Sequence, residues 1–219
     1  QTALVLQFSI TAFLLTAVII FFSQMQYMKS IPLGFNPENL ELFPATSRVL
    51  SQKMSSIKEE VLNLPFVESA ATSNHRMGGS PSGQNISNYG SDKSMSINEY
   101  RATPGFAETM QLNLVAGGFF TGNAENEIIL NEAAVKKLEL QDPAGKLVLY
   151  KGNPVTVKGV VQDFYYNENS GKEIEPLVLT PYVYSEELLY VRTMQKISAA
   201  QRLQIASIFK KFDETYELE

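Results

Sequence analysis

The sequence begins with an apolar stretch that is too long and too uniform for an ordinary helix of a globular domain. Residues 4–22 read LVLQFSITAFLLTAVIIFF and contain no charged side chain. At 1.5 Å per helical residue this run extends about 28 Å, which is close to the thickness of the hydrocarbon core of a bilayer. The sequence therefore predicts a membrane-spanning helix over residues 4–22.

The residues around this run fit the same interpretation. Tyr27 and Lys29 stand where an interfacial aromatic ring and a snorkelling cation are expected. A signal peptide would carry a basic region before the run and a small-residue cleavage site after it, and the sequence shows neither. We expect residues 1–30 to form the transmembrane helix and a stalk, and residues 31–219 to form an extracytoplasmic domain. The missing initial Met and the helical pattern at the end predict a fragment of a longer protein.

Composition excludes several functions. The 219 residues include no Cys, so disulfides, thiolate metal sites and Cys nucleophiles are all excluded. His75 is the only His, which is too few for a multi-His zinc site. The formal net charge is -5, and Lys and Arg are scattered along the chain, so we expect no nucleic-acid partner.

Hydrophobic periodicity predicts a mixed α/β domain of the α+β class. Apolar residues recur at helical spacing after Thr46 or Ser47, either of which can cap a helix that Pro65 ends. The residues on this stripe are Leu50, Met54, Ile57, Val61 and Leu64. Shorter helices are predicted over 104–110 and after Asn131, with Ala134, Val135 and Leu138 facing inward. A final amphipathic helix is predicted over 198–216, with its apolar face formed by Leu203, Ala206, Phe209 and Phe212.

Alternating apolar residues predict short strands that pair largely antiparallel. The predicted strands are 40–43, 68–73, 94–102, 127–130, 147–149, 155–161, 177–179 and 188–192. A Gly152-Asn153-Pro154 turn is expected to join two of them. Residues 76–93 are rich in Gly, Ser and Asn and are predicted to form a long surface loop. The element order allows two subdomains, one from 40–75, 94–120 and 177–219 and an inserted one from 121–176.

The sequence offers no arrangement of residues that predicts catalysis. The adjacent acids Glu59-Glu60 and Glu186-Glu187 point in different directions on a helix or a strand, so they indicate solvated faces. Asp163 ends an apolar strand and is expected to accept backbone N–H bonds in the following turn. His75 has no Ser or Asp at a spacing that would indicate a catalytic triad, so we interpret it as polar surface. We therefore predict no enzyme and no catalytic, cofactor-binding or metal-binding residue.

Several local patterns occur in order along nearly the whole chain. They are Phe8 with the apolar run, residues 34–39, Pro104-Gly105-Phe106 leading to Ala116-Gly117, residues 127–134, residues 142–146, residues 157–164 and Glu175-Pro176-Leu177. Together these patterns resemble the MacB-like periplasmic core domain of MacB/FtsX-like ABC transporter permeases, particularly those of Bacteroidetes-type bacteria. Gly118 departs from this family, in which Arg often follows Ala-Gly.

The resemblance implies a permease subunit of the bacterial inner membrane whose main domain lies in the periplasm. Such subunits work as homodimers or paired permeases with a cytoplasmic ATPase, and some engage a periplasmic adaptor. They couple ATP hydrolysis to periplasmic conformational change, for export or mechanotransmission. The phosphate-binding pattern Gly-x-x-x-x-Gly-Lys-Ser/Thr is absent from the sequence, so the ATPase is expected to be a separate chain.

Two other classes of protein stay open. A ligand-binding sensor domain of a membrane receptor would also follow one membrane helix, and it predicts a pocket lined by Tyr165, Tyr166, Tyr182, Tyr184 and Tyr190. Aromatic residues on alternating strands are more often core or cross-strand pairs. An anchored hydrolase would need a concave site with a perturbed acid near Asp163.

Overall fold

The computed structural model describes residues 2–30, 32–91, 93–122, 125–167, 173–181 and 187–218. The chain forms two compact units, Gln1–Leu33 and Gly34–Glu219. The predicted tyrosines Tyr182 and Tyr184, and Glu186, lie outside the described residues.

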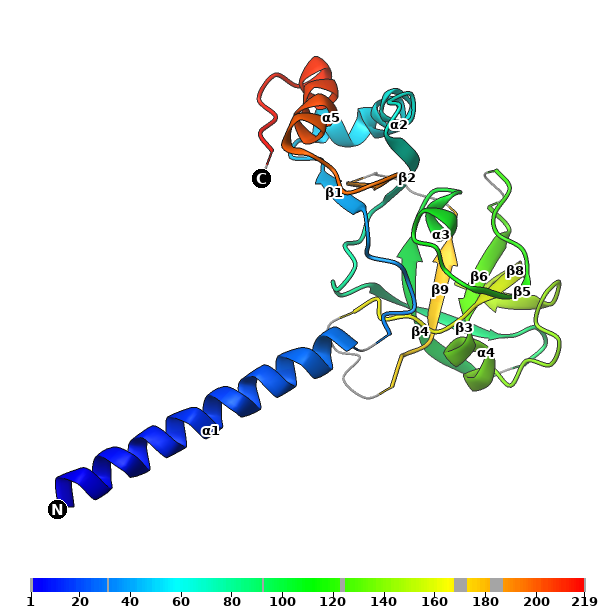
Figure 1. The fold of residues 1–219 in the computed structure, drawn as a ribbon. Helices are drawn as coiled ribbons and strands as arrows, with labels where there is room; N and C mark the ends of the chain where they lie inside the picture. The colour runs from blue at the N-terminus through cyan, green and yellow to red at the C-terminus, as the bar shows by residue number, and fades with distance from the viewer. Residues whose placement is uncertain are drawn as a thin grey trace. The chain divides into compact units, whose positions relative to one another are not determined.

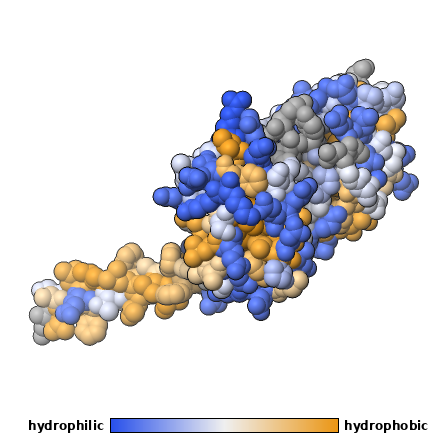
Figure 2. Space-filling view, turned by 90° about the horizontal axis from the view of Figure 1, so that it is seen from above, coloured by the Kyte–Doolittle hydropathy of each residue, from blue (hydrophilic) through white to orange (hydrophobic). Residues whose placement is uncertain are grey.

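The first unit is one long helix, α1 (Thr2–Ser30). Its segment Thr2–Tyr27 is long and apolar enough to cross a membrane, as predicted from residues 4–22. The apolar side chains along it are exposed, and Figure 2 shows their hydrophobic surface along the helix. The hydroxyls of Ser9, Thr11 and Thr16 each donate to the carbonyl four residues earlier at 2.9 Å. These bonds satisfy the hydroxyls without water.

The second unit contains a small sheet covered on one face by two helices (Figure 1). The strands are β1 (Leu40–Pro44), β10 (Leu188–Thr193) and β2 (Val67–Ser73), in that order, and both pairings are antiparallel. The covering helices are α2 (Arg48–Leu62) and α5 (Ala199–Phe212). Side chains from this face and from both helices form the first hydrophobic core.

The stripe predicted for α2 is confirmed. Ser47 accepts a hydrogen bond from the backbone N–H of Leu50, and Leu50, Met54, Ile57 and Val61 are all buried. The apolar face predicted for the last helix is partly wrong, because Leu203 is 64% exposed. The buried side chains of α5 are Ile205, Ala206, Ile208 and Phe209.

The other strands form a closed barrel. The hydrogen-bonded order is β5-β8-β6-β9-β4-β3-β7, and an additional β7–β8 pairing closes six of the seven strands into a ring. Two parallel pairings, β4 with β9 and β6 with β8, are the exceptions to the predicted antiparallel arrangement. The strands are β3 (Ser82–Asn88), β4 (Ser94–Arg101), β5 (Leu114–Gly117), β6 (Glu127–Asn131), β7 (Leu147–Tyr150), β8 (Asn153–Val161) and β9 (Leu177–Thr180).

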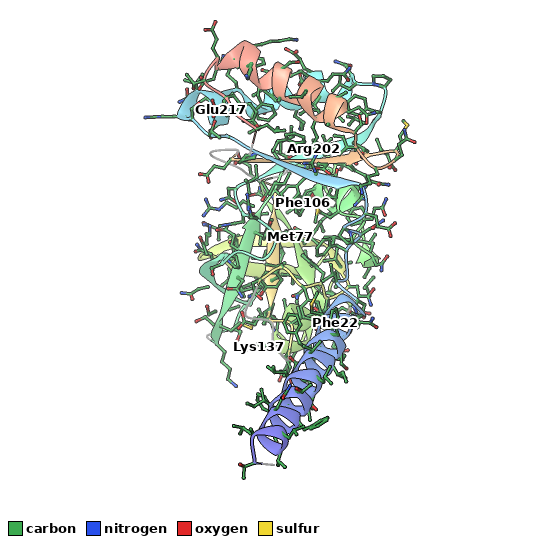
Figure 3. All side chains as sticks on the ribbon, turned by 60° about the vertical axis from the view of Figure 1, so that its left-hand side comes forward. Phe22, Met77, Phe106, Lys137, Arg202 and Glu217 are labelled. Atoms are coloured by element: carbon green, nitrogen blue, oxygen red, sulfur yellow. The ribbon has the colours of Figure 1, made fainter. Side chains whose placement is uncertain are left out.

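Two short helices and two further cores complete the domain. The helices are α3 (Phe106–Thr109) and α4 (Glu132–Lys137). The barrel encloses one core of Ile, Leu and Val side chains. Another core lies between the barrel and the inner face of the small sheet, where Figure 3 shows Phe106 and Met77. Strand β5 bonds with β8 and strand β9 with β6 of the predicted inserted part, and the division at residue 121 stays a prediction.

The predicted loop over residues 76–93 is wrong in its centre, because β3 forms there. Only Ile86 of this strand reaches the hydrophobic core, so the local sequence shows no apolar alternation. Backbone pairing on both sides, with β4 and β7, holds β3 in place. Tertiary pairing here overrides a weak local preference for strand.

The turn between β7 and β8 also differs from the prediction. Asn153 and Pro154 belong to β8, and the two turn residues are Lys151 (φ 53°) and Gly152 (φ 79°). Two positive φ angles define the hairpin turn that matches the twist of antiparallel strands. Strand β5, which the sequence did not reveal, pairs with β8 at the point where Gly117 and Gly159 allow close backbone approach.

We predict that Gly159→Ala destabilises the domain and that Gly83→Ala does not. A Cβ at Gly159 would overlap the backbone oxygen of Gly118, whereas a Cβ at Gly83 would meet only the Ser96 hydroxyl at 3.7 Å. The free energy of unfolding should fall by about 2 kcal/mol for Gly159→Ala and change by less than about 1 kcal/mol for Gly83→Ala. Urea denaturation of both variants in detergent measures this, and equal effects would contradict the close β5–β8 packing.

Candidate functional site

The second compact unit begins at residues 34–39, which we call the anchor segment. Its sequence, GFNPEN, combines one glycine, one proline and two asparagines, and it leads directly into β1. Any pull that the N-terminal helix exerts along the chain must pass through this segment. Its contacts within the domain therefore decide how firmly the domain is tethered.

One buried arginine holds the anchor segment. Arg192 is 2% exposed and lies on β10, on the face of the small sheet that also carries Tyr190. Its guanidinium donates from Nη2 to the carbonyl of Asn36 (2.7 Å), from Nη1 to that of Glu38 (2.7 Å) and from Nε to that of Thr109 (2.6 Å). Hydrogen bonds from charged donors are about twice as strong as neutral ones. Arg192 thus joins the anchor segment, β10 and the end of α3.

The charge of Arg192 is balanced by carbonyl dipoles. Within the described part of the chain, no carboxylate lies at ion-pair distance from its guanidinium. Burial lowers the pKa of Arg192, and the charge of Glu68 opposes this shift. A guanidinium stays protonated in proteins and offers five donors in a planar fork. Lysine or a neutral side chain could not reach three carbonyls in this geometry.

Asn36 fixes the shape of the anchor segment from within. Its Oδ1 accepts a bond from the backbone N–H of Glu38 at 2.9 Å, which closes a local turn. Its Nδ2 donates to Oε1 of Gln111 at 2.7 Å, and its backbone N–H donates to the carbonyl of Met110 at 3.1 Å. The residue therefore bonds both to its own turn and to the chain that follows α3.

The two ends of the anchor segment need special backbone conformations. Gly34 has φ 77°, and a Cβ there would lie 2.5 Å from the carbonyl oxygen of Asp163 and 2.6 Å from Cα of Phe164. Only glycine fits such a close approach. Asn39 has φ 55°, and its carbonyl accepts a bond from the backbone N–H of Thr193 at 2.9 Å. The glycine and asparagines of this motif thus have structural roles.

Asp163, which touches the start of the anchor segment, also caps α4. Its Oδ1 accepts from the backbone N–H of Ala133 at 2.9 Å, and its own N–H donates to Oε2 of Glu132 at 3.2 Å. Burial raises the pKa of Asp163, and the bond from Ala133 opposes that shift. The prediction that Asp163 accepts a backbone N–H is right, but the donor lies on α4 and not in the following turn.

Asn131 connects the next pair of motifs. Its Oδ1 accepts from the backbone N–H of Ala134 (3.0 Å), which confirms the predicted helix cap, and from that of Leu177 (2.8 Å). Its Nδ2 donates to the carbonyl of Glu175 at 3.0 Å. The scattered motifs of the sequence therefore form one continuous set of contacts that runs from Gly34 through Asp163 and Asn131 to Leu177.

His75 is more than polar surface. Its backbone carbonyl accepts bonds from the hydroxyls of Tyr100 and Tyr190, and its ring lies 5.5 Å from that of Tyr100. Burial lowers its pKa, and the nearby Arg101 adds to that shift. These contacts fix the chain after β2 and supply no nucleophile to the imidazole.

Of the tyrosines predicted for a receptor pocket, two of the three that the structure describes belong to a core. Tyr166 and Tyr190 are buried in the layer beneath the small sheet, and Tyr165 is half-buried.

Glu60 pairs with Lys211 at 2.5 Å, so this acid belongs to a surface ion pair. No group of three or more potential metal ligands occurs among the residues that the structure describes.

Arg192 was not predicted from the sequence to have a structural role. The strand was predicted over 188–192, and its alternation places Arg192 on the same face as Leu188 and Tyr190, which are apolar. A lone arginine on an apolar strand face is the signal that could have revealed a buried polar contact. Its three acceptors could not be found from sequence, because they lie more than 80 residues away.

An N-terminal helix able to cross a membrane, followed at once by a firmly anchored α+β domain, is typical of the extracytoplasmic part of a membrane protein. Comparison with known protein families identifies the class of membrane protein. The chain belongs to the MacB-like periplasmic core domain family, which matches residues 3–208. It is thus a periplasmic-type domain of ABC transporter permeases, while the Bacteroidetes-type assignment stays a prediction. No curated protein matches the chain.

Solved structures of low sequence identity share the fold. The periplasmic region of MacB from Actinobacillus actinomycetemcomitans is 16% identical, with a TM-score of 0.58 over 81% of this chain and 85% of that one. The extracellular domain of the ABC-type transporter YknZ from Gram-positive bacteria is 19% identical, with a TM-score of 0.56 over 81% and 96%. A domain of a protein described as a permease from Porphyromonas gingivalis is 17% identical, with a TM-score of 0.53 over 78% and 81%.

We predict that Arg192→Met lowers the free energy of unfolding by about 3 kcal/mol, because three carbonyls lose a charged donor. Arg202→Met is the matched control: Arg202 binds Glu41 at 2.6 Å, but its side chain is 45% exposed, so its loss should cost less than about 1 kcal/mol. Urea denaturation followed by near-ultraviolet circular dichroism measures both. Equal losses would contradict the role given to Arg192.

Proposed function

We propose that this chain is the non-catalytic periplasmic part of an ABC transporter permease subunit that couples cytoplasmic ATP hydrolysis to conformational change in the periplasm. The observation that carries the proposal is the fixation of the anchor segment by Arg192. A flexible linker would absorb a movement of the membrane helix in bond rotations. A segment that is hydrogen-bonded to β10 and α3 and packed against the exit of β8 would pass such a movement on to both sheets.

The proposed location is the inner membrane, with residues 4–22 across the bilayer and the main domain in the periplasm. Membership of the family and the apolar length of α1 support this location. The proposed partners are a cytoplasmic ATPase on a separate chain, a second permease subunit in a homodimer or pair, and a periplasmic adaptor. The ATPase follows from the family, and the sequence lacks the phosphate-binding loop itself.

The chemistry of the candidate residues supports a non-enzymatic role. Asp163 caps α4, Asn131 joins two motifs and His75 contributes its backbone carbonyl to a packed core. A general acid or base must reach a reacting group, and the side chains of Asp163 and Asn131 bond within the fold instead.

The proposal is tested by affinity purification of the tagged full-length protein from its native membrane in mild detergent. Mass spectrometry should recover an ABC-type ATPase at an abundance comparable to that of the tagged protein. The control is an unrelated tagged inner-membrane protein with one span, which should recover none. Recovery of a kinase, or of no ATPase while the tagged protein is intact, would overturn the permease function and favour the sensor-domain alternative.

A further inference from the structure

The closed barrel has a hollow at one end, far in sequence from the anchor segment. At this end strands β4, β7 and β9 finish and strands β6 and β8 begin. The hollow has a volume of about 490 Å³, within the range of small-molecule sites, which often occupy the mouths of barrels. Its walls include Glu99, Arg101, Ile128, Tyr150, Lys151 and Thr180.

The inward side chains of the barrel change from apolar to polar at this mouth. Ile97, Val148 and Val178 point into the barrel and belong to its core. Because strand side chains alternate, the residues two positions later point the same way. These residues are Glu99, Tyr150 and Thr180, and all three are buried. The barrel core therefore ends in a polar layer that forms the floor of the hollow.

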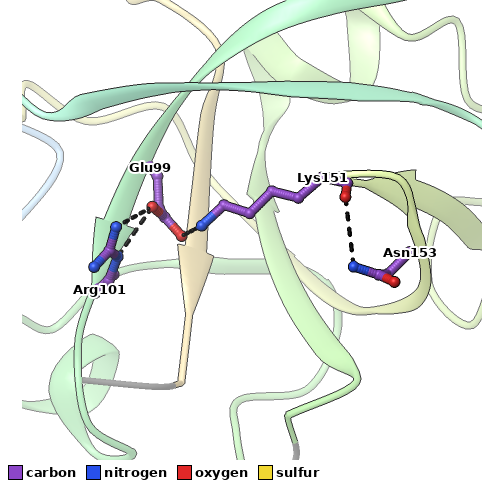
Figure 4. A network of polar contacts seen from close by, with 4 residues as sticks. All are labelled: Glu99, Arg101, Lys151 and Asn153. Atoms are coloured by element: carbon purple, nitrogen blue, oxygen red, sulfur yellow. Dashed lines mark hydrogen bonds and ion pairs between the residues drawn. The ribbon is translucent and has the colours of Figure 1, made fainter. Parts of the chain in front are cut away.

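A carboxylate held by two cations lies in this layer (Figure 4). Glu99, 2% exposed, accepts from Nε and Nη2 of Arg101 at 3.0 and 2.9 Å and from Nζ of Lys151 at 2.7 Å. Burial would raise the pKa of Glu99, but the bonds from Arg101 and Lys151 hold it below its usual value. The ionised triad carries one net positive charge. Lys151 offers three donors, of which Glu99 takes one.

One buried hydroxyl beside the triad completes no hydrogen bond with any described residue: it is Oγ1 of Thr180, on a residue that is 8% exposed. The hydroxyl of Tyr150 lies beside Glu99, and burial, with a further contribution from Glu99, keeps its pKa far above the usual value. Buried polar groups in proteins are nearly always paired, and Thr180 lines the hollow.

We propose that the barrel mouth binds a small organic anion with a single carboxylate group. The carboxylate accepts from Lys151 and from the hydroxyl of Thr180, and a short hydrocarbon part lies against Ile128 and Val155. The exposed Glu125 at the rim and the single net positive charge of the triad disfavour dianions such as phosphate. This binding site does not depend on the transport function proposed above.

The test uses butyrate as the probe and the full chain in detergent micelles. Nuclear magnetic resonance follows the δ1 methyl group of Ile128 during a titration to 50 mM. We expect a saturable shift with a dissociation constant on the order of 1 mM, as is usual for so small a ligand. Butan-1-ol and butylammonium test the hydrocarbon part without the carboxylate, and inorganic phosphate tests anion binding in general.

Two matched variants locate the site. Thr180→Val keeps the shape of the side chain and removes the hydroxyl, so it should weaken butyrate binding at least fivefold. Thr156→Val, on the neighbouring strand β8 at a position between the inward Val155 and Val157, should leave binding unchanged. The proposal is overturned by no saturable shift with butyrate, by an equal response to butan-1-ol or phosphate, or by equal effects of the two variants.

Discussion

The structure depends on a buried cation that pairs with no carboxylate among the described residues. Arg192 donates to three carbonyls that come from two distant parts of the chain, and these bonds join the anchor segment to β10 and α3. Removing a charge from water is costly, so the arginine is stable there only because the carbonyl dipoles replace its hydration. The requirement is mutual, since the turn at residues 34–39 exposes carbonyls that need a donor.

The motifs that are scattered along the sequence form one continuous set of contacts that begins at the anchor segment. Gly34 packs on the backbone at Asp163, Asp163 caps α4, and Asn131 joins the beginning of α4 to β9. Each residue type is explained by a bond or by a lack of space. The same contacts connect the entry point of the domain to the barrel, while β10 connects it to the small sheet and its helices. The anchor segment is therefore in contact with both halves of the domain.

Much of the fold was predictable because the signals were local. Neighbouring residues alone determine the apolar length of α1, the buried stripe of α2 and the Asn131 cap of α4. Strand β3 and the closure of the barrel were not predictable, because pairing with distant strands holds a polar segment in place. Neither the role of Arg192 nor the polar layer at the barrel mouth could be predicted, for the same reason. Strand alternation predicts the face on which a side chain lies but not the distant residue that it contacts.

If the anchor segment is a rigid part of the domain, the backbone amide of Asn36, which donates to Met110 in the folded chain, is protected from hydrogen exchange. We expect this amide to exchange at least about 100-fold more slowly than in an unstructured peptide of the same sequence, at a rate comparable to that of amides of β10. Exchange within about 10-fold of the unstructured peptide, while β10 stays protected, would instead show that the anchor segment is a loose linker.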